Sequence, residues 1–191
     1  MLHFALATLL AIDPVKSKVE FSVAHIFVEH VVGTVPVISG SIDLPAGTLV
    51  PTSVSAVLDP TKMKTGEVDR DGVMQTPEWF DTKKFPTWTF TSTKITPAPK
   101  GFTMDGLLTM HGVTQPEHLV VVASGDPQHP VYHATCQIDR HAFDMSVTRL
   151  DPVIGGTVDV TLDIYVTQPG RKGVPLRNAL SWKATRLRSF G

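Results

Sequence analysis

The chain has 191 residues, of which 42% are hydrophobic and 18% are charged. This composition excludes an intrinsically disordered chain, and the length suits one globular domain, with two smaller domains as the alternative. The formal net charge is −1, yet six basic residues and no acidic ones follow Pro169, so −7 remains on the preceding residues. An acidic body disfavours nucleic acid as the main partner. The lone Cys136 excludes an intramolecular disulfide.

The first twelve residues form an apolar segment that is too short to span a bilayer. Small residues at Ala5, Ala7 and Ala11 suit cleavage by a signal peptidase, whereas the charged start of a signal peptide is missing apart from the α-amino group. The segment is therefore either a truncated or unusual signal peptide or an apolar first strand. We favour the signal peptide, which predicts a periplasmic or secreted protein. The expected divisions are residues 1–12, a domain over 13–168 and a basic extension over 169–191.

Apolar and polar residues alternate with a period of two along most of the chain, which is typical of half-buried strands. The pattern predicts strands over 18–27, 53–58, 87–95, 102–110, 119–124, 131–138 and 157–166. Proline- and glycine-rich turns separate several of these segments. One short helix is expected over 70–80, and Pro77 limits its length. The pattern indicates an antiparallel sandwich or barrel, and a barrel would remove the exposed edges of such long strands.

Five short segments occur in a fixed order along most of the chain, roughly over 15–166. They are Phe21-Ser-Val-Ala-His25, Lys64-Thr-Gly-Glu-Val-Asp-Arg-Asp71, Phe80-Asp81 with Pro86 and Phe90, Leu108-Thr-Met-His-Gly-Val-Thr114, and Ile138-Asp-Arg-His-Ala-Phe-Asp-Met145. Together they resemble the YceI-like family. Two departures stand out: Asp144 occupies a position where glycine is usual, and residues 35–40 replace an Arg-Gly-rich turn.

The resemblance implies an all-β, antiparallel, lipocalin-like barrel of about eight strands. It also implies an exported, non-enzymatic protein that carries or stores a long isoprenoid lipid, of the polyprenyl or quinone type. No cofactor is expected beside this lipid. The oligomeric state stays open, with a homodimer as one alternative. Alternation alone fits a filled core as well as a hollow barrel, so the cavity is expected from the resemblance.

The residues expected to bind the lipid fall into two groups. The predicted apolar lining is Phe21, Val23, Trp88, Phe90, Met104, Leu108, Met110 and Phe143. Near the mouth, Arg70 suits a phosphate or carbonyl head group, and His25 and His111 could donate hydrogen bonds to it. Each of these three has a structural alternative. Arg70 could pair with a neighbouring acidic residue, and His111 could bond a turn.

Other interpretations concern sites outside this lining. Cys136 lies near two histidines in the sequence, but a cysteine in the middle of a strand is usually an inert small hydrophobe. A metal- or histidine-assisted enzyme is the alternative function, with a metal facet formed by His133, Gln137, Asp139 and His141. The basic extension suggests a third class, an envelope interaction protein. Its leucines at 176, 180 and 187 approach helical spacing, which suits contact with an anionic membrane.

Overall fold

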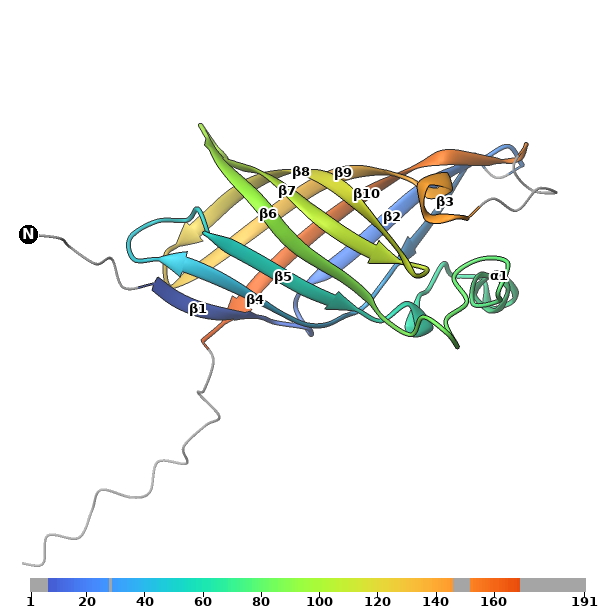
Figure 1. The fold of residues 1–191 in the computed structure, drawn as a ribbon, viewed down its shortest axis with the longest axis horizontal. Helices are drawn as coiled ribbons and strands as arrows, with labels where there is room; N and C mark the ends of the chain where they lie inside the picture. Colours follow the sequence, from blue (N-terminus) through green and yellow to red (C-terminus); the bar gives the residue numbers. More distant parts are fainter. Residues whose placement is uncertain (1–6, 28, 146–151, 169–191) are drawn as a thin grey trace, which may run out of the picture.

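The computed structural model describes residues 7–27, 29–145 and 152–168. These residues form one antiparallel sheet with three short helical segments (Figure 1). The strands are β1 (Ala7–Ile12), β2 (Lys18–His25), β3 (Glu29–Thr34), β4 (Val37–Pro45), β5 (Ser53–Leu58), β6 (Trp88–Ala98), β7 (Gly101–Met110), β8 (Val113–Asp126), β9 (His129–Asp139) and β10 (Ile154–Thr167). The helical segments are the 3-10 turns η1 (Pro60–Lys62) and η2 (Arg140–Phe143) and the α-helix α1 (Val68–Met74).

The sheet closes on itself as a barrel. Its strand order is β1-β4-β5-β6-β7-β8-β9-β10-β2-β3, and β1 also pairs with β10. Along β10, Thr167 faces Ala11 of β1 and Asp163 faces Lys18 of β2, so β1 and β2 lie end to end at one position of the barrel. β4 and β3 continue them in the same way at the next position. The ten described strands therefore occupy eight positions, which confirms the predicted lipocalin-like barrel.

The alternation of β7 shows why these residues form a barrel wall. Its side chains alternate between the inside and the outside, so that one face is removed from water and the other is partly exposed. Burial of each large apolar side chain contributes about 1.5–3 kcal/mol. The inward positions of β7 are Phe102, Met104, Gly106, Leu108 and Met110.

The first strand covers the described half of the apolar N-terminal segment. Residues 7–12 form β1, in which Leu10 is fully buried and Ile12 is 4% exposed, both within the hydrophobic core. Residues 7–12 are therefore a strand of the folded barrel, and export of the protein stays a prediction. β3 and β4 were not predicted, because Gly33, Pro36 and Gly40 interrupt the alternation of residues 31–42.

The other predicted elements differ from the structure mainly at their ends. The helix begins at Val68 and ends at Met74, and the chain then turns through Pro77 to Phe80. β8 begins at Val113, six residues before the predicted start. No helix in the described part of the chain is long and apolar enough to cross a bilayer. The basic extension over 169–191, with its leucines near helical spacing, lies outside the described residues.

Candidate ligand cavity

The inside of the barrel is hollow. The centre of a water-sized sphere can move through a cavity volume of about 200 Å³. One bound water needs only about 10–15 Å³ on the same measure. Every described strand except β3 contributes to its lining. Close-packed protein cores hold few voids larger than one water. The structure therefore separates two interpretations that alternation could not, and it favours a barrel with room for a ligand.

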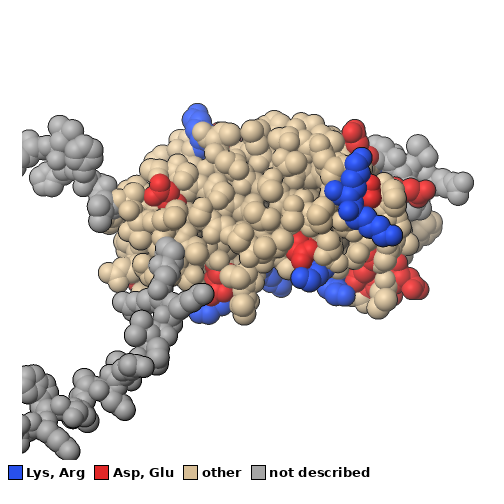
Figure 2. Space-filling view, turned by 60° about the horizontal axis from the view of Figure 1, so that its bottom comes forward, with Lys and Arg blue, Asp and Glu red and all other residues tan. Residues whose placement is uncertain are grey.

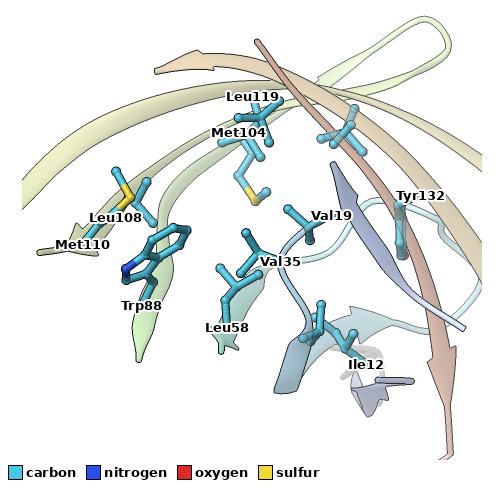
Figure 3. Close-up of a cluster of buried hydrophobic side chains, with 14 of the residues drawn as sticks. Ile12, Val19, Val35, Leu58, Trp88, Met104, Leu108, Met110, Leu119 and Tyr132 are labelled. Carbon is cyan, nitrogen blue, oxygen red and sulfur yellow. The ribbon is translucent and has the colours of Figure 1, made fainter. Parts of the chain in front are cut away.

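The lining is almost entirely aliphatic, aromatic and sulfur-containing. Side chains from several strands point toward one another around the interior, with Trp88 on one side of it and Tyr132 across from it (Figure 3). The Trp88 ring packs on Phe80, with 4.8 Å between the ring centroids. On β7, a Cβ atom at Gly106 would clash with the ring of Phe90. Glycine at this position therefore lets the aromatic ring lie against the wall.

Seven of the eight predicted lining residues face this cavity. They are Phe21, Val23, Trp88, Phe90, Met104, Leu108 and Met110. The prediction was wrong for Phe143, which is the last residue of η2: its side chain is completely buried in the core and does not line the cavity. Contact of the seven residues with a ligand stays a prediction.

Sequence reasoning missed the part of the lining that comes from β4, β5 and the segment after α1. Trp79 and Phe80 of that segment, together with Met74 at the end of α1, reach the cavity although they lie outside any strand. No periodic signal marks them, since the chain turns repeatedly between α1 and β6. The missed residues of β8 and β9 could have been found, because Leu119, Val121 and Ala134 follow the alternation of strands that were predicted.

Arg70 does not reach the cavity. Its Nε donates to Thr65 Oγ1 at 2.8 Å and its Nη2 to the Thr65 carbonyl at 2.9 Å. Asp71, on the same helix, accepts from Thr65 N and Thr65 Oγ1 at 2.7 and 2.6 Å. The Thr65 hydroxyl is the main cause of the lowered pKa of Asp71. Arg70 thus fastens α1 to the preceding loop, which corrects the expectation that it faces a head group.

The two histidines predicted near the mouth also lie outside the lining. His111 Nδ1 is 3.0 Å from the carbonyl oxygen of Phe143, so the ring joins the end of β7 to η2. His25 Nδ1 accepts a hydrogen bond from Phe27 N at 3.3 Å, and the two rings lie 5.7 Å apart. The structural alternative describes both residues, and the structure does not bring them together with the apolar lining.

Two charged residues line the otherwise apolar cavity, Glu117 and Arg140. Arg140 is buried, and it donates from Nε to the carbonyl of Gly155 at 3.0 Å and from Nη2 to that of Ile154 at 3.1 Å. Its Nη1 donates to the carbonyl of Met145. Burial, and secondly the charge of Asp139, raises the pKa of Glu117. Both residues therefore contribute carbon atoms to the apolar surface of the cavity, and their charged groups do not open into it.

The remaining polar groups of the lining are weak acids that stay protonated near neutral pH. Burial raises the pKa of Tyr132 to about 12. Burial and then the charge of Glu117 raise the pKa of Cys136 to about 12 as well. Because the thiolate is the reactive form of cysteine, Cys136 fits the inert role expected for it.

The predicted metal facet is divided among separate pairs on the outside of the barrel. His133 Nδ1 lies 2.8 Å from Asp163 Oδ1, and His141 Nδ1 lies 3.1 Å from Asp139 Oδ1. Gln137 donates to Asp159 at 2.8 Å. Within residues 7–27, 29–145 and 152–168, no group of three or more potential ligands is arranged to hold a metal ion. On the face shown in Figure 2, acidic and basic side chains gather near the end of the barrel that carries α1.

A model of the YceI-like domain matches residues 10–166, which is the barrel without the start of β1 and the last residue of β10. The chain belongs to the YceI-like family. A UPF0312 protein of Vibrio parahaemolyticus is 26% identical over 157 residues, covering 78% of this chain and 80% of that protein. A second UPF0312 protein, from Yersinia enterocolitica, is 29% identical over 112 residues, covering 59% of this chain and 58% of its own length.

Two solved structures show the same fold. BcnA of Burkholderia cenocepacia superimposes with a TM-score of 0.73 at 21% identity, covering 82% of this chain and 99% of BcnA. A polyisoprenoid binding domain from Saccharophagus degradans, implicated in plant cell wall breakdown, gives a TM-score of 0.62 at 15% identity over 84% of this chain and 98% of that domain.

The structure also explains one departure from the family pattern. Asp144 has a φ of 58°, in the left-handed region that favours glycine. Aspartate tolerates this region better than most residues do.

Proposed function

We propose that this YceI-like protein binds one long-chain isoprenoid lipid, of the polyprenyl or quinone type, inside its barrel and carries or stores it without catalysis. The observation that carries the proposal is the apolar cavity enclosed by the eight strand positions. A flexible hydrocarbon chain suits such a space because it needs few directional contacts. The solved polyisoprenoid binding domain with the same fold supports this ligand class.

The energetics of burial are sufficient for this role. Removing ~500 Å² of ligand apolar surface from water at ~25 cal/mol per Å² offers ~12 kcal/mol before ordering costs. Apolar contact alone could therefore hold an isoprenoid, and the flexible thioethers of Met104 and Met110 suit an irregular chain. The polar part of the ligand would then decide selectivity more than affinity.

The chemistry of the lining supports binding without a reaction. The Cys136 thiol stays protonated near neutral pH, since its pKa is about 12. The histidines of the alternative enzyme hypothesis, His133 and His141, pair with Asp163 and Asp139 on the outside of the barrel. No observation in the described chain favours that alternative over a binding protein.

Native mass spectrometry of protein purified from its own host tests the proposal most directly. We expect a species heavier than the apoprotein by one lipid, and organic extraction should release a single polyprenyl or quinone compound. A bare apoprotein mass that stays unchanged after incubation with quinones, polyprenyl alcohols and polyprenyl phosphates would contradict the proposed function.

Export to the periplasm is part of the same proposal. Cleavage after Ala11 would remove Leu10, which is fully buried in the core. We therefore expect any processed form to retain β1. The intact mass of protein from the periplasmic fraction measures this, and a chain that begins after Ala11 and still folds would contradict it.

A further inference from the structure

The two ends of the barrel differ in the side chains that they expose. The turn between β2 and β3, α1 and η2 lie at one end, and the turns of the β4–β5, β6–β7 and β8–β9 hairpins lie at the other (Figure 1). The first end exposes Ile26 and Phe27, at 68% and 75%, and Val68 and Val73, at 83% and 50%. The described turns of the other end, 46–52, 99–100 and 127–128, contain no exposed large hydrophobic side chain.

The turn after β2 presents its two apolar side chains to water from a fixed backbone. Ile26 N donates to the carbonyl of Val153 at 3.1 Å, and Phe27 N donates to His25 Nδ1 at 3.3 Å. Val153 directly precedes β10, so the turn is tied to the neighbouring strand. A large apolar side chain gains free energy when it leaves water, and neither residue achieves this within the described chain.

The segment around α1 connects this exposed surface with the cavity. Met74 at the end of α1 and Trp79 and Phe80 after it line the cavity. Val68 and Val73 of the same helix are exposed to solvent. One short segment is therefore apolar on the side of the cavity and also on the side of the surrounding water.

This segment is attached to the barrel by side-chain packing rather than by strand pairing. In the described chain, the hydrogen bonds of residues 67–82 have all their partners within residues 61–85. Its contact with the wall includes the Phe80 ring on Trp88. A segment held in this way opens at a lower free-energy cost than a strand in a continuous ladder. The cavity wall therefore opens most easily beside α1.

The charges around α1 are balanced. Residues 59–87 contain five basic and six acidic residues, which gives a net charge of −1. Both signs are visible near this end of the barrel in Figure 2. Such a surface has little attraction for an anionic membrane, so contact with a bilayer would depend on insertion of apolar side chains.

We propose that the barrel end that carries α1 docks on the surface of a zwitterionic lipid bilayer, with Ile26, Phe27, Val68 and Val73 inserted, and that lipid passes between bilayer and cavity at this end. The exposed side chains and part of the cavity wall belong to one segment, which places the docked surface directly beside the cavity. The choice of a bilayer as the occupant rests on the proposed function, because an isoprenoid cargo dissolves in a bilayer and has to be collected there.

The test is flotation of delipidated full-length protein with vesicles of phosphatidylcholine, at low and at high salt. A parallel series uses vesicles that also contain phosphatidylglycerol. One double variant, Ile26→Thr with Phe27→Ser, removes the apolar turn, and a second, Val68→Thr with Val73→Thr, removes the apolar side chains of α1.

The matched control is Val120→Thr with Val122→Thr. It makes the same chemical change on the outer face of β8, where the two valines are 51% and 45% exposed. Thermal unfolding of each variant verifies the fold, and gel filtration at several protein concentrations measures self-association.

We expect wild type to float with phosphatidylcholine vesicles at both salt concentrations, because salt screens charges but does not weaken apolar insertion. Each of the two double variants should bind at least about tenfold more weakly, since the free energy of burying a large apolar side chain corresponds to about a tenfold change or more. The control should bind as wild type does.

Three results would overturn the proposal. The first is a wild type that does not bind phosphatidylcholine vesicles, or that binds them as well as both double variants do. The second is binding only to vesicles with phosphatidylglycerol and its loss in salt, which would assign the contact to the basic extension. The third is self-association that the same substitutions abolish without any vesicle binding, which would assign the surface to a second copy of this chain.

Native mass spectrometry separates this inference from the function on which it rests. If lipid is retained by the purified protein but vesicles are not bound, the docking surface is wrong and the lipid-binding function stands. If vesicles are bound through the four residues but no lipid is ever retained, the proposed function fails and the docking surface stands.

Discussion

Filling the cavity should have opposite effects on stability and on lipid binding. Ala134 on β9 lies in the wall between Val121 of β8 and Leu162 of β10, and it is 4% exposed. Its small side chain faces the cavity. Replacing Ala134 with leucine places three additional carbon atoms in free space, where they meet apolar neighbours.

The magnitude follows from the area removed from water. At ~0.8 kcal/mol per buried CH₂ group, three carbons offer about 2.4 kcal/mol. Loss of leucine rotamer freedom offsets about 0.5–1 kcal/mol of this. A net gain of about 1.5 kcal/mol would raise the Tm of the apoprotein by about 3–6 °C for a chain of this size. The same carbons overlap with a ligand, and overpacking of about 1–3 kcal/mol weakens binding by about 5- to 150-fold.

Differential scanning calorimetry of delipidated protein measures the first effect, and titration with geranylgeraniol measures the second. The matched control is Thr135→Leu, because Thr135 is the next residue of β9 and is exposed on the outer face. Substitutions on an exposed surface usually change stability by less than about 0.5 kcal/mol. The control should leave lipid affinity unchanged.

Two results would refute the reasoning. If Ala134→Leu lowers the Tm of the apoprotein, the space beside Ala134 is already filled, and the barrel is not hollow at that point. If the variant is more stable and binds geranylgeraniol as well as wild type does, the lipid does not occupy the interior.

Three further predictions concern the barrel wall and the hydrogen bonds that hold its neighbouring segments in place. Leu10→Ala should lower the free energy of unfolding by about 2–5 kcal/mol in urea titrations, since Leu10 is fully buried in β1; an effect below 1 kcal/mol would mean that β1 is not an integral part of the barrel. The pKa of Asp71 is lowered in the folded protein, mainly by Thr65, so its stabilising contribution is present above the ordinary carboxyl pKa and is lost as the pH falls. The stability difference between wild type and Asp71→Asn should therefore shrink between pH 6 and pH 3 in urea unfolding, and a constant difference would contradict this origin. The thiol of Cys136, with a pKa of about 12, should resist alkylation at pH 8 until the protein is unfolded, and rapid labelling of the native state would show that the wall opens at β9.

The barrel could be predicted because its longest strands are regular. β10 alternates Val158, Val160 and Leu162 inside with aspartate and threonine outside, and each of these positions is where a period of two places it. The same rule located seven lining residues. It failed at β3 and β4, where Gly33 and Pro36 break the pattern at the place where two strands lie end to end.

The predicted bounds of one strand also left out Glu117, which lies on β8. The predicted strand began at Leu119, whereas β8 begins at Val113; proline within a strand usually argues against a central strand. In the structure Pro116 faces Leu107 within the pairing of β7 and β8, and the strand continues through it. Extending the alternation back from Leu119 by two residues would have placed Glu117 inside the barrel. The signal was present in the sequence, but an acidic residue was not expected on an apolar face.

The prediction that certain polar residues contact the head group was wrong for a more general reason. A sequence shows which side chains can form hydrogen bonds, but it does not show which partner is near. Arg70 bonds to Thr65, and His111 bonds to Phe143. Both side chains thereby fasten the segments that lie at one end of the barrel, α1 and η2.

These fastenings have a consequence for the ligand. Because Arg70 and His111 bond to the protein, and Arg140 is held by backbone carbonyls, the basic groups suited to a phosphate are occupied by internal partners. A phosphate head group inside the barrel would therefore have to displace one of these internal bonds to find a cation, whereas an apolar chain needs no such partner.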